Sequence, residues 1–127
     1  MEVRRLDRDL LGPANNHSQR LVPWAALNAP FEGAWCVVKA GTATTAHAHH
    51  EYEIFIAVSG EAVLSSKGER TPFRPGDIVH FPPHVDHQVV NDGDEDFQMY
   101  AVWWDVPMSE NFVARDRDPS LDPRNGG

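Results

Sequence analysis

The sequence has few of the residues on which several classes of protein depend. A single cysteine, Cys36, occurs among 127 residues, so no disulfide can form within the chain, and this composition fits a reducing compartment. Lysine and arginine number 11 against 19 aspartate and glutamate residues, which gives a formal net charge of −8. Because nucleic acids and anionic membranes are bound through cationic surfaces, we expect neither as the main partner.

Long apolar runs are also lacking. No stretch approaches the length needed to cross a bilayer, and the first residues, MEVRRLDRDLLG, lack the apolar segment of a secretory signal peptide. We therefore expect a cytoplasmic protein. A hydrophobic content of 41% in a chain of this length is enough for one domain with its own core.

Short apolar runs alternate with turn signals from residue 33 to residue 105. Runs such as AWCVV and YEIFIAVSG are rich in β-branched and aromatic residues, and SSKGE and NDGDE carry the glycine expected in hairpin turns. This spacing predicts an all-β sandwich or barrel over residues 33–105. Residues 1–32 are predicted to form an N-terminal arm and segment, in which prolines argue against a long helix. Residues 106–127 are predicted to be a flexible C-terminal tail or a loosely packed arm.

The strand predicted at EIFIAV is apolar on both faces. Alternation places Phe55 and Ala57 on one face and Ile54, Ile56 and Val58 on the other. One face can pack inside a barrel, and the other face then needs a second cover, either another sheet or another subunit. We therefore expect a homodimer, and the segment LVPWAAL is a candidate to cross to the partner.

Imidazole and carboxylate groups are concentrated in the stretch GTATTAHAHHEYEIFIAVSG, residues 41–60. His47 and His49 share one face of an extended strand, and Glu53 has the same parity. Burial of these groups beside an apolar run would be unfavourable without a partner, and a divalent metal ion would remove that cost.

A fourth ligand is expected from the stretch GDIVHFPPHVDHQVVN, residues 76–91. It offers His80, His84 and His87. His87 is favoured because it opens an apolar run directly after a proline-fixed turn, at the start of a strand that can lie beside the first stretch.

The two stretches resemble the two sequence motifs of the cupin superfamily. The first fits as Gly, five residues, His-x-His, three residues, Glu, six residues, Gly. The second fits except that His84 stands where the motif has a glycine. The resemblance covers residues 33–105 and implies a small antiparallel barrel of the jelly-roll type. Carried over residue by residue, it implies four metal ligands: His47, His49, Glu53 and His87.

Three further residues are candidate catalytic proton carriers near the barrel mouth: Tyr52, His80 and His84. His80 lies within a predicted strand and can face either the lumen or the outside. His84 is either a loop residue or a base, and its side chain disfavours the positive φ that glycine permits.

Other side chains have simpler interpretations. Glu51 is predicted to be a surface charge, and His50 a solvated side chain or a hydrogen-bond donor beside the ligands. Cys36 is predicted to be a small buried apolar residue, and His17 to lie in a mobile loop. The tryptophans are predicted to be core or interface aromatics, with adjacent ones on opposite faces: Trp35, Trp103 and Trp104.

Three imidazoles and one carboxylate suit Zn²⁺, Fe²⁺, Mn²⁺, Ni²⁺ or Cu²⁺, and we favour one zinc ion per chain. Four protein ligands leave coordination positions open, which favours catalysis on a small molecule.

A narrower resemblance is carried by HHEYEIFIAVSGEA, GDIVHFPP followed by HQVVND, and MYAVWWD. It is to small bacterial cupins that act beside an amino-acid-activating, methionyl-tRNA-synthetase-like partner as hydrazine synthetases. It implies a metal-dependent enzyme that forms an N–N bond in an amino-acid-derived molecule. An iron-dependent dioxygenase and a non-catalytic module that binds a metal or small ligand are the alternatives.

Overall fold

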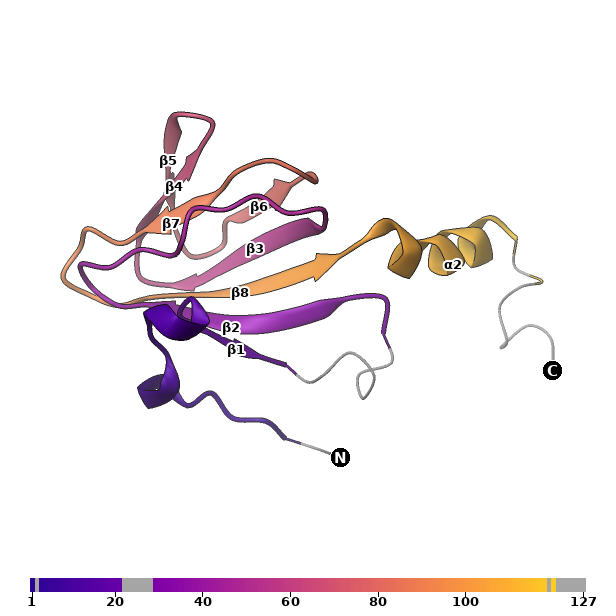
Figure 1. The fold of residues 1–127 in the computed structure, drawn as a ribbon. Coiled ribbons are helices and arrows are strands. Elements are labelled where there is room, and N and C mark those ends of the chain that lie inside the picture. The colour runs from indigo at the N-terminus through magenta and orange to yellow at the C-terminus, as the bar shows by residue number, and fades with distance from the viewer. Residues whose placement is uncertain (2, 22–28, 119, 121–127) are drawn as a thin grey trace.

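The computed structural model describes residue 1, residues 3–21, residues 29–118 and residue 120, and these residues form two antiparallel β-sheets that pack face to face (Figure 1). The five-stranded sheet consists, in spatial order, of β1 (Ser18–Arg20), β2 (Glu32–Val38), β8 (Phe97–Trp104), β3 (Tyr52–Ser59) and β6 (Ile78–Phe81). The three-stranded sheet consists of β5 (Glu69–Phe73), β4 (Ala62–Ser66) and β7 (Gln88–Val90). The predicted small all-β barrel of the jelly-roll type is confirmed.

The two predicted hairpin turns differ in outcome. SSKGE joins β4 to β5, and Lys67 and Gly68 both have positive φ, as a two-residue turn between antiparallel strands requires. NDGDE is not a hairpin turn, because it joins β7 of one sheet to β8 of the other. The buried side chain of Asn91 holds this crossing in place, since its Nδ2 donates to the carbonyl oxygens of Val38 and Glu95.

Apolar side chains from both sheets fill the space between them. Alternation along β3 buries Phe55 and Ala57, whereas Ile54 and Ile56 are half-buried on the other face and Val58 is exposed. The core is completed by residues from the remaining strands: Cys36, Val38, Ala62, Leu64, Phe73, Phe81, Val89, Phe97, Met99 and Ala101. The two faces predicted for this strand are therefore confirmed.

The N-terminal residues lie along β2. Two short 3₁₀ turns, η1 (Arg8–Leu10) and η2 (Pro13–Asn15), lead into β1, which pairs with β2. The prediction that His17 lies in a mobile loop is wrong, because its side chain is only 3% exposed. Its carbonyl oxygen accepts the Val37 N–H at 3.0 Å, which ties the residue to β2. LVPWAAL spans residues 21–27, and residues 22–28 lie outside the described residues. The structure therefore does not describe the crossing predicted for this segment or the proline within it.

The chain continues from β8 into α2 (Val106–Arg117), where the sequence predicts a flexible tail or a loose arm. The helix begins there because the Asp105 side chain caps it, accepting the Met108 N–H at 3.0 Å, with a proline in the first turn. Figure 1 shows α2 extending away from the two sheets. In the part of the chain described, no helix combines the length and apolarity needed to cross a membrane.

Candidate metal centre

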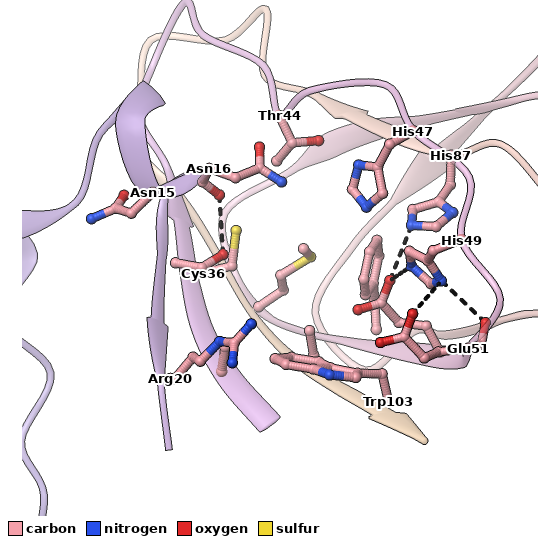
Figure 2. Close-up of a pocket in the computed structure, with 16 residues that line it drawn as sticks. Asn15, Asn16, Arg20, Cys36, Thr44, His47, His49, Glu51, His87 and Trp103 are labelled. Carbon is pink, nitrogen blue, oxygen red and sulfur yellow. Dashed lines mark hydrogen bonds and ion pairs between the residues drawn. The ribbon is translucent and has the colours of Figure 1, made fainter. Parts of the chain in front are cut away.

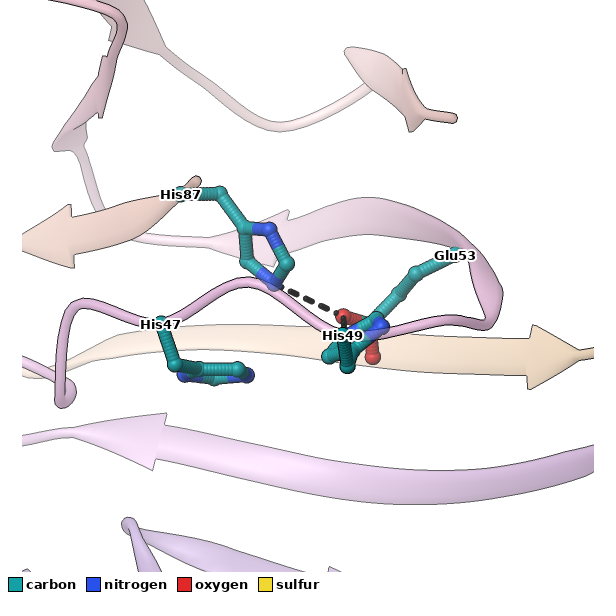
Figure 3. A group of neighbouring side chains, drawn as sticks. All are labelled: His47, His49, Glu53 and His87. Carbon is teal, nitrogen blue, oxygen red and sulfur yellow. Dashed lines mark hydrogen bonds and ion pairs between the residues drawn. The ribbon is translucent and has the colours of Figure 1, made fainter. Parts of the chain in front are cut away.

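Four side chains with metal-binding atoms meet between the sheets (Figure 3). They are the four that the sequence motifs predict as ligands, and one atom of each lies within 4.8 Å of the others: His47, His49, Glu53 and His87. His47 and His49 precede β3, and Glu53 is the second residue of β3. His87 stands directly before β7, and an isolated β-bridge to His47 brings the two motifs together.

The backbone selects which nitrogen each histidine presents. Nδ1 of His47 lies 2.8 Å from the Thr45 carbonyl oxygen. Nδ1 of His49 and of His87 lie 3.1 Å and 3.0 Å from the carbonyl oxygens of Glu51 and Val85. A carbonyl oxygen can only accept, so each Nδ1 carries the hydrogen. In the neutral ring the lone pair that a metal needs then lies on Nε2, the atom that faces Glu53 Oε1 at 3.1 Å in His49 and at 3.0 Å in His87.

His87 has the most restricted environment of the four. Its side chain is 2% exposed, and the Phe81 ring stacks on it with centroids 4.5 Å apart. Nε2 of His87 lies 3.0 Å from Glu53 Oε1 but has no hydrogen-bond partner in suitable alignment. Burial acts to lower the pKa of His87, but the Glu53 carboxylate and the Val85 carbonyl group outweigh it and raise that pKa overall.

The donor set fits a divalent metal ion. A buried carboxylate faces three imidazoles, and a buried nitrogen with a lone pair lacks a partner. Binding of a cation by all four atoms would remove the cost of burying them. The site is therefore a His/Glu cluster able to hold a metal.

The cluster opens into a cavity of about 550 Å³ (Figure 2). Phe55, Met99, Ala101 and Trp103 form apolar parts of its wall. The N-terminal residues contribute four polar side chains to the cavity wall, none of which was predicted from the sequence: Asn15, Asn16, Ser18 and Arg20. β1 has only three residues, too few to show the alternation of apolar and polar side chains that marks a strand. Nothing in the local sequence indicates that it pairs with β2.

The predicted proton carriers lie elsewhere. Tyr52 and His80 project from the face of the five-stranded sheet opposite the cavity, where they stack with Trp104 at centroid separations of about 6 Å. His84 is exposed and is not part of the described cavity wall. Its φ is +65°, so it adopts the left-handed conformation of the motif's glycine, and its N–H donates to the His49 carbonyl at 2.7 Å.

Glu51 and Cys36 line the cavity, and Glu51 is therefore not the simple surface charge predicted. Glu51 Oε1 lies 3.7 Å from Nδ1 of His49 and 3.4 Å from Nδ1 of His50, whose other ring nitrogen approaches Asp105. Cys36 is buried, as predicted, and burial raises the pKa of its thiol to about 11. The thiol is thus held protonated and unreactive at neutral pH.

The protein is similar to several proteins of known structure or activity. The cupin domain family model matches residues 34–103. The structure resembles that of a Cupin 2 conserved barrel domain protein from Salinispora arenicola CNS-205, with 57% identity and a TM-score of 0.78 over 91% of this chain and 98% of that one. It also resembles the plu4264 protein from Photorhabdus luminescens, with 38% identity and a TM-score of 0.76 over the same shares of both chains.

A curated relative of known activity matches over a shorter stretch. Glucose-6-phosphate isomerase from Pyrococcus horikoshii is 36% identical over 56 residues, which are 40% of this chain and 30% of the isomerase. The chain therefore aligns with less than a third of that relative's length.

Proposed function

The chain belongs to the cupin domain family, and from that premise we propose that it is a metal-dependent enzyme acting on a small, amino-acid-derived molecule. The observation that carries this proposal is the orientation of three Nε2 atoms and one carboxylate into a single cavity. The metal we propose is Zn²⁺, with Fe²⁺, Mn²⁺, Ni²⁺ and Cu²⁺ compatible with the same ligands. When bound, such an ion polarises an oxygen atom of the substrate and stabilises negative charge on it.

The residues around the cluster define what can enter. A cavity of about 550 Å³ lies within the ordinary range for small-molecule sites, roughly 300–1,000 Å³. Phe55, Met99 and Trp103 give the wall beside the cluster apolar surface, and a molecule that displaced water from this surface would strengthen polar interactions there. Glu51 lines the cavity beside His49 but does not belong to the cluster. Its carboxylate is the group that we assign to accept a proton from a bound molecule.

The reaction we propose is N–N bond formation, supported by the resemblance to cupins of hydrazine synthetases. The substrate would be an amino acid esterified through its carboxyl group to a hydroxylamine oxygen, supplied by a separate amino-acid-activating enzyme. The lone pair of the amino acid's amine attacks the hydroxylamine nitrogen and forms the N–N bond. The N–O bond breaks at the same time, and its electron pair leaves with the oxygen as the amino acid's carboxylate. The amine loses a proton, which Glu51 accepts. The step needs no oxidant, because the N–O bond supplies the oxidising equivalent.

The experiment measures metal content and turnover under strict anaerobiosis. Purified protein should hold about one divalent ion per chain, and zinc-loaded protein should convert a hydroxylamine ester to an N–N product without oxygen. His47→Ala should lose both metal and turnover. His50→Ala is the matched control for metal content, because His50 belongs to the same segment but not to the cluster, and it should keep its metal.

Other outcomes would assign the alternatives. A strict need for O₂ together with Fe²⁺ would move the protein to the dioxygenases. Metal-dependent ligand binding without turnover would make it a binding module. An unchanged rate in His47→Ala stripped of metal would overturn the metal-dependent mechanism.

We also propose that the protein is a homodimer through the outer face of the five-stranded sheet. Ile78 on this face is 65% exposed, and Tyr52, His80 and Trp104 form an aromatic stack beside it. A groove of about 230 Å³ continues the apolar surface toward α2 and is lined by six residues: Pro30, Phe31, Val102, Trp104, Ser109 and Phe112. A second copy of the chain would cover this surface.

Light scattering at micromolar concentration tests the dimer. The unmodified protein should be dimeric, and Ile78→Asp should be monomeric because it places a charge in the apolar contact. Thr71→Asp is the control, since Thr71 is exposed on β5 of the three-stranded sheet, and it should remain dimeric. A monomeric unmodified protein would contradict the proposal.

A further inference from the structure

The cavity carries one fixed cation, at the end formed by β1. Arg20 is the only lysine or arginine among the described residues that line it. The chain as a whole has an excess of acidic residues, so this placement is not a consequence of composition. Figure 2 shows the Arg20 side chain extending toward Trp103, on the side of the cavity away from His47 and His87.

Trp103 holds the guanidinium group in place. The guanidinium carbon of Arg20 lies 5.7 Å from the centroid of the Trp103 ring, within the distance of a cation–π contact. No carboxylate of the described residues forms an ion pair with Arg20. A guanidinium group that rests on an aromatic face keeps its N–H donors directed outward, where they match both oxygens of a carboxylate.

Strand register sets the position of Arg20 relative to the metal cluster. Arg20 pairs with Ala34, which pairs with Ala101, so two small side chains leave the cavity open between β1 and β3. Trp103 is the direct partner of Glu53 on the neighbouring strand. β1 and β3 are three strand spacings apart, about 14 Å. The Arg20 guanidinium group nevertheless reaches the Trp103 ring on β8, the strand next to Glu53, so one molecule several bonds long can span from this group to the cluster.

Formal charge favours an anionic occupant. A divalent ion at the cluster, the carboxylates of Glu51 and Glu53, and the guanidinium group of Arg20 leave one net positive charge in the cavity. A single carboxylate neutralises that charge. Asn16 adds a polar partner nearby, because its Oδ1 accepts the Thr45 N–H at 2.8 Å and its amide nitrogen remains a donor.

We propose that the substrate carries a carboxylate that binds Arg20 while another polar group of the same molecule faces the His/Glu cluster. This inference rests on the proposed metal-dependent function and adds the class of substrate, a small carboxylic acid with a metal-coordinating group at its other end. In the proposed ester the amino acid's own carboxyl group is esterified, so the free carboxylate belongs to the hydroxylamine part. Arg20 is then a specificity-determining residue, and Trp103 is a positioning residue that acts through it.

The test uses two probes of equal length. Succinic acid monohydroxamate and butyrohydroxamate share a metal-binding hydroxamate, and they differ in ending with a carboxylate or a methyl group. Each is titrated calorimetrically into zinc-loaded protein. We expect the carboxylate-ended probe to bind about tenfold more tightly or better, the usual effect of a charge-assisted hydrogen bond.

Variants assign this preference to Arg20. Arg20→Gln should bind the two probes equally, and Arg20→Lys should keep part of the preference because it retains the charge but loses the planar donor pair. Arg70→Gln is the matched control, since Arg70 is exposed on β5 and does not line the cavity, and it should keep the full preference. Thermal melts that match the unmodified protein establish that the variants are folded.

The outcomes separate the two proposals. Zinc-dependent binding of both probes with equal affinity would overturn the assignment of Arg20 and leave the metal site standing. Retention of the carboxylate preference in Arg20→Gln would likewise overturn it. Zinc-independent binding, or no binding of either probe, would overturn the proposed metal site and this inference with it.

Discussion

The two ends of the space between the sheets are built from the same strands but from different chemistry. On β8, Trp103 and Ala101 line the cavity, whereas Phe97 is completely buried and packs against Phe73. On β3, Glu53 lines the cavity, whereas Ala57 belongs only to the packed core. The alternation that brings every second side chain inward is the same at both ends. The two ends differ in the inward side chains themselves: at the packed end they fill the space between the sheets, and at the other end they leave a cavity.

This contrast separates stability from chemistry within one small barrel. The packed end removes large aromatic and aliphatic side chains from water, which is the main favourable term in folding. The cavity end buries a carboxylate and imidazoles, which costs free energy until a cation binds them. Substitutions at the packed end should therefore lower stability whether or not metal is present, and substitutions at the cluster should act mainly through the metal.

Phe97→Ala should give the largest effect, because Phe97 is completely buried against both sheets. Removal of a core phenylalanine typically costs about 3–5 kcal/mol of unfolding free energy, through lost burial and the cavity that remains. Urea unfolding of metal-free protein measures it. A loss below about 1 kcal/mol would be that of an ordinary surface substitution and would show that this end is not the packed core.

His87→Ala should lower the stability of the zinc-loaded protein by removing the metal's contribution. A ligand at 100 times its dissociation constant stabilises the folded state by about 2.7 kcal/mol, and the variant should lose most of that. Thermal melts with zinc and with EDTA measure the difference, beside metal analysis.

His50→Ala is again the control, since its ring is exposed and lies outside the cluster. It should keep the full zinc-dependent shift. Full metal occupancy in a His47→Ala/His87→Ala double variant would contradict the ligand assignment.

The parts that were predictable from sequence are those that local spacing encodes. The His-x-His pair and Glu53 lie within seven residues of one another, so the sequence predicts them as near neighbours, even though a bend at His50 and Glu51 separates the histidines from β3. The turn at Lys67 and Gly68 is likewise a local feature. His87 comes from a distant segment, and it was predicted both from its place at the start of an apolar run after a proline-fixed turn and from the family motif.

The parts that were missed depend on contacts between distant residues. Arg20 reaches the cavity because β1 pairs with β2, and no local sequence pattern around Arg20 predicts that pairing. His17 is buried for the same reason. NDGDE has the composition of a hairpin turn, yet its strands belong to different sheets because Asn91 anchors the crossing to Val38. Composition records which conformations a turn tolerates, not which strands it joins.

Cys36 allows a finer test, because it lies on the boundary between the cavity and the core. Burial raises the pKa of its thiol from 9.0 to about 11, so the folded chain keeps a proton that the unfolded chain loses above pH 9. The unfolding free energy should therefore fall as pH rises from 9 toward about 11, by up to ~1.4 kcal/mol per pH unit.

Urea unfolding of the unmodified protein and of Cys36→Ala at pH 8, 9 and 10 isolates this contribution, because other groups titrate alike in both. The difference in unfolding free energy between them should shrink with rising pH. Iodoacetamide should leave Cys36 unmodified in the folded protein at pH 8. Rapid alkylation there would show an ionised, accessible thiol and contradict its assignment to the core side of the boundary.

The smallest effect is expected at the rim of the cavity end, where His84 has a φ of +65°. A side chain with a Cβ pays roughly 1 kcal/mol in this conformation, and glycine does not. His84→Gly should therefore be more stable than His84→Ala by about 1 kcal/mol, the reverse of the usual order, because alanine ordinarily exceeds glycine. Both variants keep the N–H that donates to the His49 carbonyl, so zinc affinity should match that of the unmodified protein in each.

Urea unfolding of the two variants measures the difference in stability, and zinc titration measures the affinity. If the alanine variant were the more stable, the loop would not need the left-handed conformation. If zinc affinity fell in both variants alike, the His84 ring itself would belong to the site at the open end of the barrel.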